Sequence, residues 1–414
     1  MIDFTTFQLA NGLTFYVHRD ADTPMAAFNI CYNVGSRDEE PTRTGFAHLF
    51  EHLMFGGSAN VPDFDAPLQT AGGESNAFTN NDITNYYELL PAQNLETAFW
   101  LESDRMRALN IDPEVLDTQR KVVVEEFKET CLTQPYGDVW HHLSALCYEH
   151  HPYRWPTIGL VPEHVEEAQL EDVRHFFQRH YNPANALVVV AGNVTEQQVR
   201  DLAEKHFGDI PAGERYERRL AAEPPQTSAR RREVYGNAPL PALYLAFPMM
   251  DRTDPDYYTV DLLSDLLGNG PSSRLYRRLL KERQLFSAID CYVSGSFEPG
   301  LLVVEGKPSD GITLEVCEQA IWEELTELTD APVEAEELEK VINKAESTLI
   351  FSESSVLNRA INLAGFAILG IPERINEEVE LYRQRTPEMI HDVARRILRR
   401  ERSNTLYYRP EVST

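Results

Sequence analysis

The residues with the clearest chemical potential are His48, Glu51 and His52, which lie in the segment from residue 44 to residue 55. This segment predicts one short helix, because apolar residues recur along it at helical spacing and a pair of glycines follows it. Residues three or four apart share one face of a helix, so the two imidazoles and the carboxylate point the same way. Two histidines one turn apart can both bind one metal ion.

The spacing alone has a second explanation, which is a cluster of polar side chains that satisfy one another. With 12 histidines in the chain, H-x-x-E-H arises by chance in about 4% of such sequences. The pattern is also the inverse of H-E-x-x-H and is the signature of the inverzincin metallopeptidases. A zinc ion carrying a water molecule would satisfy all three side chains.

A catalytic zinc ion takes three protein ligands and leaves one position open for water. Glu51 is better placed as a base that moves a proton from this water to the leaving amine than as a ligand. The helix predicted from residue 113 to about residue 130 offers three candidates for the third ligand: Glu125, Glu126 and Glu129. Spacing does not choose among them, and a solvated acidic face is the alternative for each. A ligand belongs on the buried side, which favours Glu126, on the face of Gln119.

Composition describes a globular protein and excludes several classes of partner. The 414 residues are 42% hydrophobic and 25% charged, which is typical of soluble globular chains. A net charge of -28 argues against binding to nucleic acid or to an anionic membrane surface. The first residues lack the pattern of a signal peptide, and no apolar run is long enough to span a membrane. Five scattered cysteines without a C-x-x-C pair indicate reduced thiols in a cytoplasmic protein.

The elements around the predicted metal helix alternate between strands and helices. A hairpin is expected within residues 3–18, and a third strand follows at residues 25–34. Two further strands are expected on either side of a polar turn at residues 80–82. Other predicted elements follow in order: helices at 94–109 and 171–180 and a buried strand at 187–193. Residues 214–232 lack apolar periodicity and predict a linker.

The second half of the chain repeats the pattern of the first half, so that residues 241–248 correspond to residues 24–31. The helix near residue 260 corresponds to the metal helix, but Asp261, Ser264 and Asp265 replace its two histidines and its glutamate. We therefore predict an α+β protein with two homologous domains, each a mainly antiparallel sheet packed against helices. The predicted boundaries are 1–213 for the metal-binding domain, 214–232 for the linker and 233–414 for the second domain. Two unrelated domains of similar periodicity are the alternative.

Several segments together resemble the pitrilysin/insulysin metallopeptidase family, in its branch similar to mitochondrial processing peptidase. These segments are spread over nearly the whole chain: 9–14, 34–39, 45–57, 72–79, 151–153, 181–185 and 272–276. The resemblance implies the fold of mitochondrial processing peptidase and one zinc ion per chain, held by His48, His52 and Glu126, with Glu51 as the base. Glu126 is the second glutamate of the family's V-V-x-E-E segment.

The resemblance also implies that a peptide or unfolded substrate adds as a strand beside a sheet edge at Gly73, Asn76, Ala77 and Phe78. Many relatives carry a glutamate where this chain has Gln119. An amide in this position can still hydrogen-bond a partner of the site, but it contributes no charge.

Besides Gln119, the chain departs from the family at Leu280 and Ser287. Relatives that act alone or as homodimers carry an arginine and a tyrosine at these two positions, and these residues hold the substrate carbonyl. The resemblance therefore predicts that this chain is the zinc-bearing subunit of a two-chain chamber, whose homologous partner supplies the Arg/Tyr pair. The alternatives are a non-catalytic scaffold subunit of the same fold and a self-sufficient homodimeric peptidase.

Overall fold

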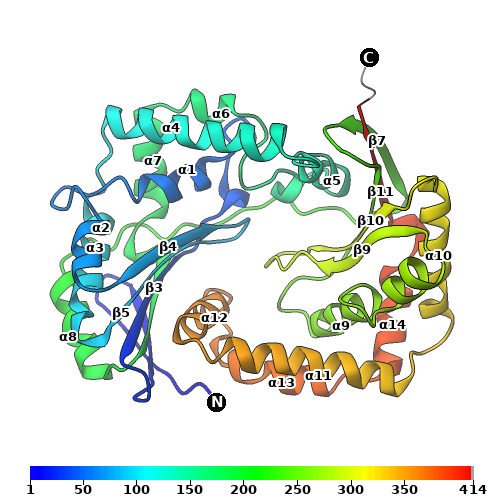
Figure 1. Ribbon diagram of the computed structural model, residues 1–414. Helices are drawn as coiled ribbons and strands as arrows, with labels where there is room; N and C mark the ends of the chain where they lie inside the picture. Colours follow the sequence, from blue (N-terminus) through cyan, green and yellow to red (C-terminus); the bar gives the residue numbers. More distant parts are fainter. Residues whose placement is uncertain (412–414) are drawn as a thin grey trace. The chain divides into compact units, whose positions relative to one another are not determined.

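The computed structural model describes residues 1–411 and contains two β-sheets, each packed against helices (Figure 1). The residues divide into two compact units, each with its own sheet. Unit 1 consists of residues 1–127, 155–220 and 350–377. Unit 2 consists of residues 128–154, 221–349 and 378 onward.

The sheet of unit 1 has six strands in the order β1-β2-β6-β3-β5-β4. Neighbouring strands pair antiparallel, except that β2 and β6 are parallel. The edge strand β4 and its neighbour β5 form the hairpin predicted around residues 80–82. The strands are β1 (Thr5–Gln8), β2 (Thr14–Arg19), β3 (Met25–Tyr32), β4 (Glu74–Thr79), β5 (Thr84–Pro91) and β6 (Ala186–Gly192).

Helices cover both faces of this sheet. One face packs on the main hydrophobic core, to which α1, α3, α4, α7 and α8 contribute. The helix α12 lies against β3 and β6. The helices of unit 1 are α1 (Phe46–Leu53), α2 (Asp65–Thr70), α3 (Glu96–Arg107), α4 (Pro113–Phe127), α6 (Glu163–Glu166), α7 (Leu170–His180), α8 (Glu196–Phe207) and α12 (Val356–Ile368).

The sheet of unit 2 has five strands in the order β7-β11-β8-β10-β9. Its one parallel pair, β7 with β11, corresponds to β2 with β6, and the other pairs are antiparallel. Strand order and direction thus repeat those of unit 1, which confirms the predicted fold class and its two homologous halves. The strands are β7 (Arg230–Gly236), β8 (Ala242–Pro248), β9 (Phe286–Val293), β10 (Leu301–Pro308) and β11 (Asn404–Pro410).

The helices of unit 2 pack on its sheet in the same manner. A core of apolar residues joins α9, α10 and α14 to one face. A smaller apolar cluster joins α5 to β8, β10 and β11. The helices are α5 (Val139–Cys147), α9 (Tyr257–Leu267), α10 (Leu314–Asp330), α11 (Ala335–Ser352, whose last three residues fall in unit 1), α13 (Glu378–Arg383) and α14 (Pro387–Ile397), with a π-helical segment at Tyr276–Glu282.

One helix from each half of the chain belongs to the compact unit that the other half mainly forms. The helix α5 follows α4 in the sequence but packs on the sheet of unit 2. In the reverse direction, α12 comes from the second half and packs on the sheet of unit 1. The compact units therefore differ from the predicted boundaries at 1–213 and 233–414, because the partners of these two helices are distant in sequence.

Two predicted segments differ from the structure in detail. The helix expected to continue to about residue 130 is α-helical only to Phe127 and passes into a π-helical segment, Lys128–Thr133. The expected linker, 214–232, has no regular structure up to residue 229, but β7 begins at Arg230. The first part of this linker is anchored within unit 1, because Arg218 donates hydrogen bonds to Asp38.

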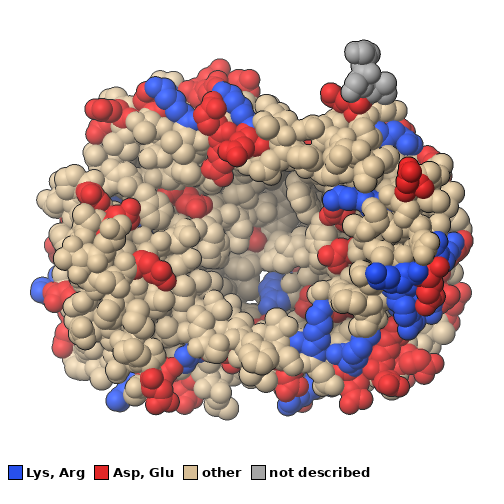
Figure 2. Space-filling model, viewed as in Figure 1, with Lys and Arg blue, Asp and Glu red and all other residues tan. Residues whose placement is uncertain are grey.

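The surface of the protein is predominantly acidic, with 66 Asp and Glu against 38 Lys and Arg. Acidic side chains gather over α4 and α6 on the face drawn in Figure 2. Among residues 1–411, no helix combines the length and the apolar composition that crossing a bilayer requires.

Candidate metal centre

The helix α1 forms because its apolar residues share one side. Phe46, Leu49, Phe50 and Leu53 are buried, and they belong to the core of unit 1. The helix begins after Gly45, whose φ of +86° is a left-handed conformation that favours glycine. His48, Glu51 and His52 lie away from the core and are each partly buried.

The helix α4 packs against α1 and carries the predicted third ligand. The close approach of the two helices requires a glycine after α1, since a Cβ atom at Gly56 would lie 2.7 Å from Cγ1 of Val115. Val115 is in the first turn of α4, whereas Glu126 is in its last turn. An antiparallel arrangement of this kind brings Glu126 beside the histidines of α1.

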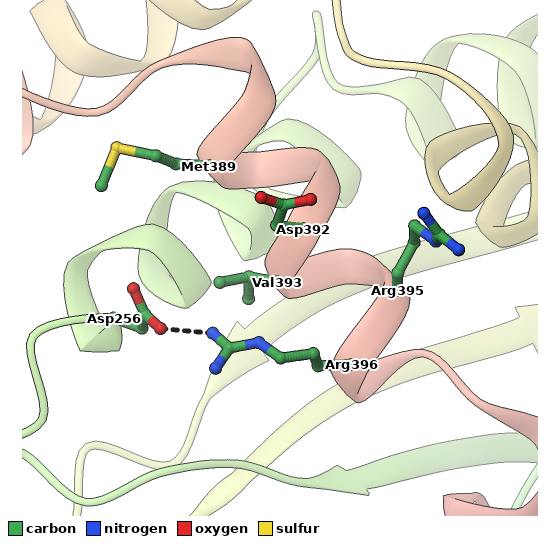
Figure 3. Close-up of a pocket in the computed structure, with 6 residues that line it drawn as sticks. All are labelled: Asp256, Met389, Asp392, Val393, Arg395 and Arg396. Atoms are coloured by element: carbon green, nitrogen blue, oxygen red, sulfur yellow. Dashed lines mark hydrogen bonds and ion pairs between the residues drawn. The ribbon is translucent and has the colours of Figure 1, made fainter.

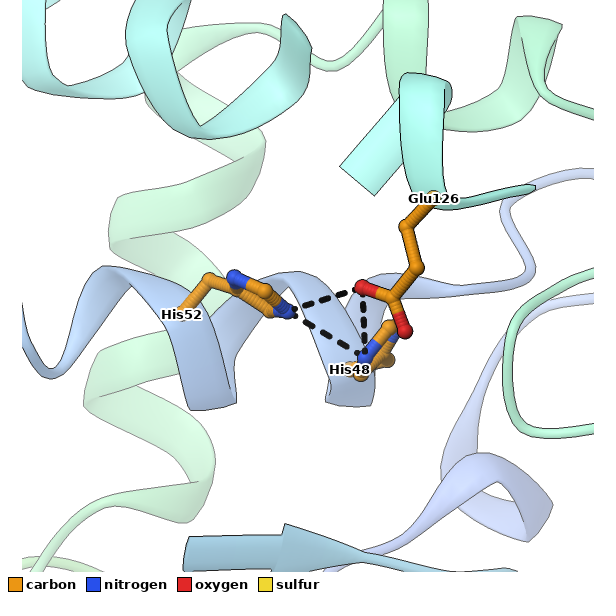
Figure 4. Close-up of side chains that lie close together, drawn as sticks. All are labelled: His48, His52 and Glu126. Carbon is orange, nitrogen blue, oxygen red and sulfur yellow. Dashed lines mark hydrogen bonds and ion pairs between the residues drawn. The ribbon is translucent and has the colours of Figure 1, made fainter. Parts of the chain in front are cut away.

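The two imidazoles and the carboxylate converge on one point (Figure 4). The Nε2 atoms of His48 and His52 are 3.3 Å apart. Oε2 of Glu126 lies 3.3 Å from Nε2 of His52 and 3.7 Å from Nε2 of His48. Ligand atoms bound tetrahedrally to zinc at about 2.05 Å are separated by about 3.4 Å. The three donor atoms therefore fit a zinc ion.

The surroundings favour the deprotonated forms that bind metal. Burial lowers the pKa of His48, against the opposing effect of the neighbouring Glu126. A hydrogen bond from His52 lowers the pKa of Glu126, although partial burial works in the other direction. A neutral imidazole and an ionised carboxylate are the ligating states of these groups.

The other residues predicted for this region are placed as follows. Within residues 1–411, His48, His52 and Glu126 form the one group of at least three His, Cys, Asp or Glu donors close enough to share an ion. Glu51 lies outside this group, on the same helix as the histidines. Glu125 and Glu129 are exposed, and Glu126 is partly buried. Gln119 is partly buried on α4, two turns before Glu126.

The predicted substrate strand is the edge strand β4, which pairs with β5 on one side. Asn76 is exposed, and Ala77 and Phe78 are partly buried. Gly73 precedes the strand at a point where a Cβ atom would lie 2.6 Å from Cδ1 of Leu68. The helix α1 packs next to β4, so the edge lies in the same unit as the candidate ligands.

The corresponding helix of unit 2, α9, carries no comparable group. Asp261 accepts a hydrogen bond from the hydroxyl of Tyr382. Asp265 accepts one from Asn269 and lies 3.8 Å from Nζ of Lys344. Both aspartates are thus engaged in bonds that stabilise the fold around α9.

The two positions that depart from the family also have structural partners in unit 2. Leu280 packs against the hydrophobic core. The hydroxyl of Ser287, on the edge strand β9, donates to the carbonyl oxygen of Lys307 on β10 at 3.2 Å. Neither side chain carries a positive charge or a phenolic hydroxyl.

A separate pocket lies on α14 of unit 2 (Figure 3). Its volume is about 580 Å³. An ion pair between Arg396 and Asp256 crosses it, and Asp392 and Arg395 also contribute opposite charges. Asp256 and Asp392 are the two carboxylates among the residues that line it, so the pocket offers fewer than the three donors that converge at α1 and α4.

Sequence reasoning missed two buried charged residues at the ends of α1. Glu39 accepts hydrogen bonds from the backbone at the start of the helix. Arg105 donates to the carbonyl oxygen of Met54 at its end. The sequence signal for Glu39 was Gly45. A glycine before a helix has no side chain to accept hydrogen bonds from the first N–H groups, so another residue must accept them.

Comparison with known protein families finds two models that match successive parts of the chain. The model described as "Insulinase (Peptidase family M16)" matches residues 14–159, which include the candidate ligands. The model described as "Peptidase M16 inactive domain" matches residues 167–345, which include Asp261 and Asp265. The H-x-x-E-H helix α1, which faces Glu126 as the third donor, lies within the segment that the insulinase model matches. The chain belongs to peptidase family M16, the insulinase or pitrilysin family, as the sequence predicted.

Individual relatives support this assignment. The chain is 29% identical over 356 residues to "Zinc protease PqqE" of Helicobacter pylori, covering 84% of this chain and 80% of the relative. It is 26% identical to "Probable mitochondrial-processing peptidase subunit beta" of Schizosaccharomyces pombe, over 80% of this chain and 75% of the relative. The crystal structure of a protease from Helicobacter pylori superposes with a TM-score of 0.93 at 26% identity, covering 99% of this chain and all of the other.

Proposed function

We propose that this chain is a zinc-dependent endopeptidase that binds one zinc ion through His48, His52 and Glu126. The observation that carries the proposal is the convergence of three donor atoms from α1 and α4, whose separations of 3.3 to 3.7 Å are those of neighbouring ligands in a tetrahedral site. A scaffold subunit would have no need of this set of side chains.

The chemistry follows from the positions of the side chains. Zinc, when bound, polarises the scissile carbonyl and makes water acidic enough to lose a proton near neutral pH. The carboxylate of Glu51 takes the proton of the attacking water as its oxygen bonds to the carbonyl carbon. Glu51 then gives this proton to the amide nitrogen as the C–N bond breaks, so that an acid and an amine leave. Gln119 acts as an uncharged hydrogen-bond partner near the site.

The substrate in this proposal is an extended peptide or an unfolded segment. It pairs as an added strand with β4, alongside Gly73, Asn76, Ala77 and Phe78. Support comes from the position of β4 at the edge of the sheet and from its contact with α1. Main-chain pairing is tolerant of sequence, since the hydrogen bonds involve groups that every residue carries.

We further propose that the active form is a two-chain assembly. A homologous partner without its own H-x-x-E-H supplies the arginine and tyrosine that this chain replaces with Leu280 and Ser287. The engagement of Leu280 in the core and of Ser287 with β10 supports this assignment. Family members that act alone would instead carry both residues in one chain.

The location proposed for this enzyme is the cytoplasm. All five cysteines are buried as free thiols. This state is typical of proteins in a reducing compartment.

The test of the metal and of the base uses Glu51→Gln, with Glu125→Gln as a matched surface control. Zinc content is measured after dialysis, and hydrolysis is followed with a library of quenched fluorescent peptides in the presence of the homologous partner. Glu51→Gln should keep its zinc and lose activity by about 10²–10⁴-fold, whereas Glu125→Gln should match the wild type. Loss of zinc from Glu51→Gln, or retention of activity, would contradict the role of Glu51.

The partner is tested by comparing the chain alone with the chain mixed with a homologue that carries the Arg/Tyr pair. Hydrolysis should appear only in the mixture. Full activity of the chain alone would favour the self-sufficient homodimer, and zinc binding without activity in either sample would favour a scaffold.

A further inference from the structure

The helix that bears both histidines is too short to be stable without help. An α-helix of eight residues such as α1 is far below the length at which isolated helices persist in water. Its first N–H groups and its last carbonyl groups also need partners from outside the helix. Two buried residues, Glu39 at the start of α1 and Arg105 at its end, meet these needs with side-chain hydrogen bonds.

The N-terminal end is held by Glu39. Its Oε2 accepts a hydrogen bond from the N–H of Gly45 at 3.0 Å, and its Oε1 accepts one from the N–H of Ala47 at 2.8 Å. Glu39 follows a 3₁₀ turn whose first residue, Ser36, accepts a hydrogen bond from the indole of Trp155. The carboxylate is therefore fixed in position, and it lies at the end of the helix where the macrodipole favours negative charge.

The C-terminal end is held by Arg105, which is only 1% exposed. Its Nη1 donates to the carbonyl oxygen of Met54 at 3.5 Å. The guanidinium is itself immobilised, since its other nitrogens bind the carboxylate of Glu102. Its planar face lies over the rings of Phe64 and Tyr86, 4.4 and 4.5 Å from their centres. Positive charge is favourable at this end of a helix.

We propose that Glu39 and Arg105 are positioning residues that fix both ends of α1 and thereby set the separation of the Nε2 atoms of His48 and His52. The proposal rests on the zinc site proposed above. His48 directly follows Ala47, whose N–H Glu39 holds, and His52 lies two residues before Met54. Burying charges costs more free energy than burying apolar groups of similar size. The role we assign to the two groups is therefore to define the position of the helix ends.

The experiment compares Glu39→Gln with Glu40→Gln, because Glu40 is the exposed neighbour. It also compares Arg105→Lys with Arg107→Lys on the same helix. Burial raises the pKa of Glu39 to about 8, while the two N–H groups oppose this rise by stabilising the ionised form. Measurements are therefore made above pH 8. Zinc affinity is determined by competition with a chelator, and the visible spectrum of the cobalt-substituted protein reports the ligand geometry.

Both test variants should bind zinc about 10–100-fold more weakly, as is typical when a group that orients a ligand is removed. The cobalt absorption bands of the folded variants should also change in position or intensity, and both controls should match the wild type. A folded Glu39→Gln that has the wild-type cobalt spectrum and zinc affinity, with only a lower melting temperature, would overturn the positioning role.

Two further outcomes are distinguished by the same measurements. A wild-type protein that binds neither zinc nor cobalt would overturn the proposed function and, with it, the positioning role. If Glu39→Gln fails to fold, Glu39→Asp takes its place, because it keeps the charge but its shorter side chain cannot hold both N–H groups. Glu39→Asp should then show the altered spectrum, and a wild-type spectrum would again overturn the proposal.

Discussion

The substitution Glu126→Asp tests the reach of the third ligand. Removing one methylene group withdraws the carboxylate by about 1.5 Å. For a withdrawal along the line that joins the two atoms, its distance from Nε2 of His52 grows from 3.3 Å to about 4.8 Å. Two atoms that both lie about 2.1 Å from one zinc ion are separated by no more than about 4.2 Å. The shortened side chain therefore cannot share an ion with His52 while the helices stay in place.

The expected result is a loss of zinc affinity of at least about a hundredfold, or about 2.8 kcal/mol. The assay is competition with a chelator of known affinity, with circular dichroism as the check on folding. Glu125→Asp on the exposed side of α4 is the matched control and should bind zinc like the wild type. Wild-type affinity in a folded Glu126→Asp would refute the assignment of Glu126 as a ligand.

Three further outcomes are expected. Leu280→Arg combined with Ser287→Tyr should raise peptide hydrolysis by the chain alone at least about tenfold, and no increase would count against the missing Arg/Tyr pair. Burial lowers the pKa of His180 from 6.5 to about 4. Between pH 6.5 and pH 4 the unfolded chain therefore binds a proton at this side chain that the folded chain does not bind. About 3 kcal/mol of stability is lost as the pH falls through this range. Denaturant titrations of His180→Gln should lack this loss, unlike those of the exposed His175→Gln. Residues 1–213 expressed alone should not fold, since they lack α12, and co-expression with 214–414 should restore a folded complex.

Much of the candidate site could be predicted because its determinants are local. The spacing of His48 and His52 places them on one helix face whatever surrounds the helix. The helical period likewise places Glu126 on another face than Glu125 and Glu129, and its side chain there is 43% exposed. The repeated order of elements in the two halves was sufficient to predict two sheets of one kind.

The remaining features depend on contacts between residues far apart in the sequence. The apolar pattern of α5 or α12 does not indicate which of the two similar sheets the helix covers. The predicted domain boundaries therefore assigned each helix to the domain nearest to it in the sequence. Glu39 lies in the polar stretch of residues 37–41, yet it is only 7% exposed. Its burial follows from the N–H groups of α1, and a sequence pattern does not show which carboxylate reaches them.

Zinc K-edge X-ray absorption of the purified, zinc-loaded chain tests the central claim most directly. The three donor atoms that converge from α1 and α4 predict a spectrum with two imidazoles and additional oxygen ligands at about 2.0–2.1 Å. The scattering of one imidazole should disappear in His52→Ala. A chain that retains no zinc, or a spectrum with sulfur at about 2.3 Å from the cysteines, would contradict the account.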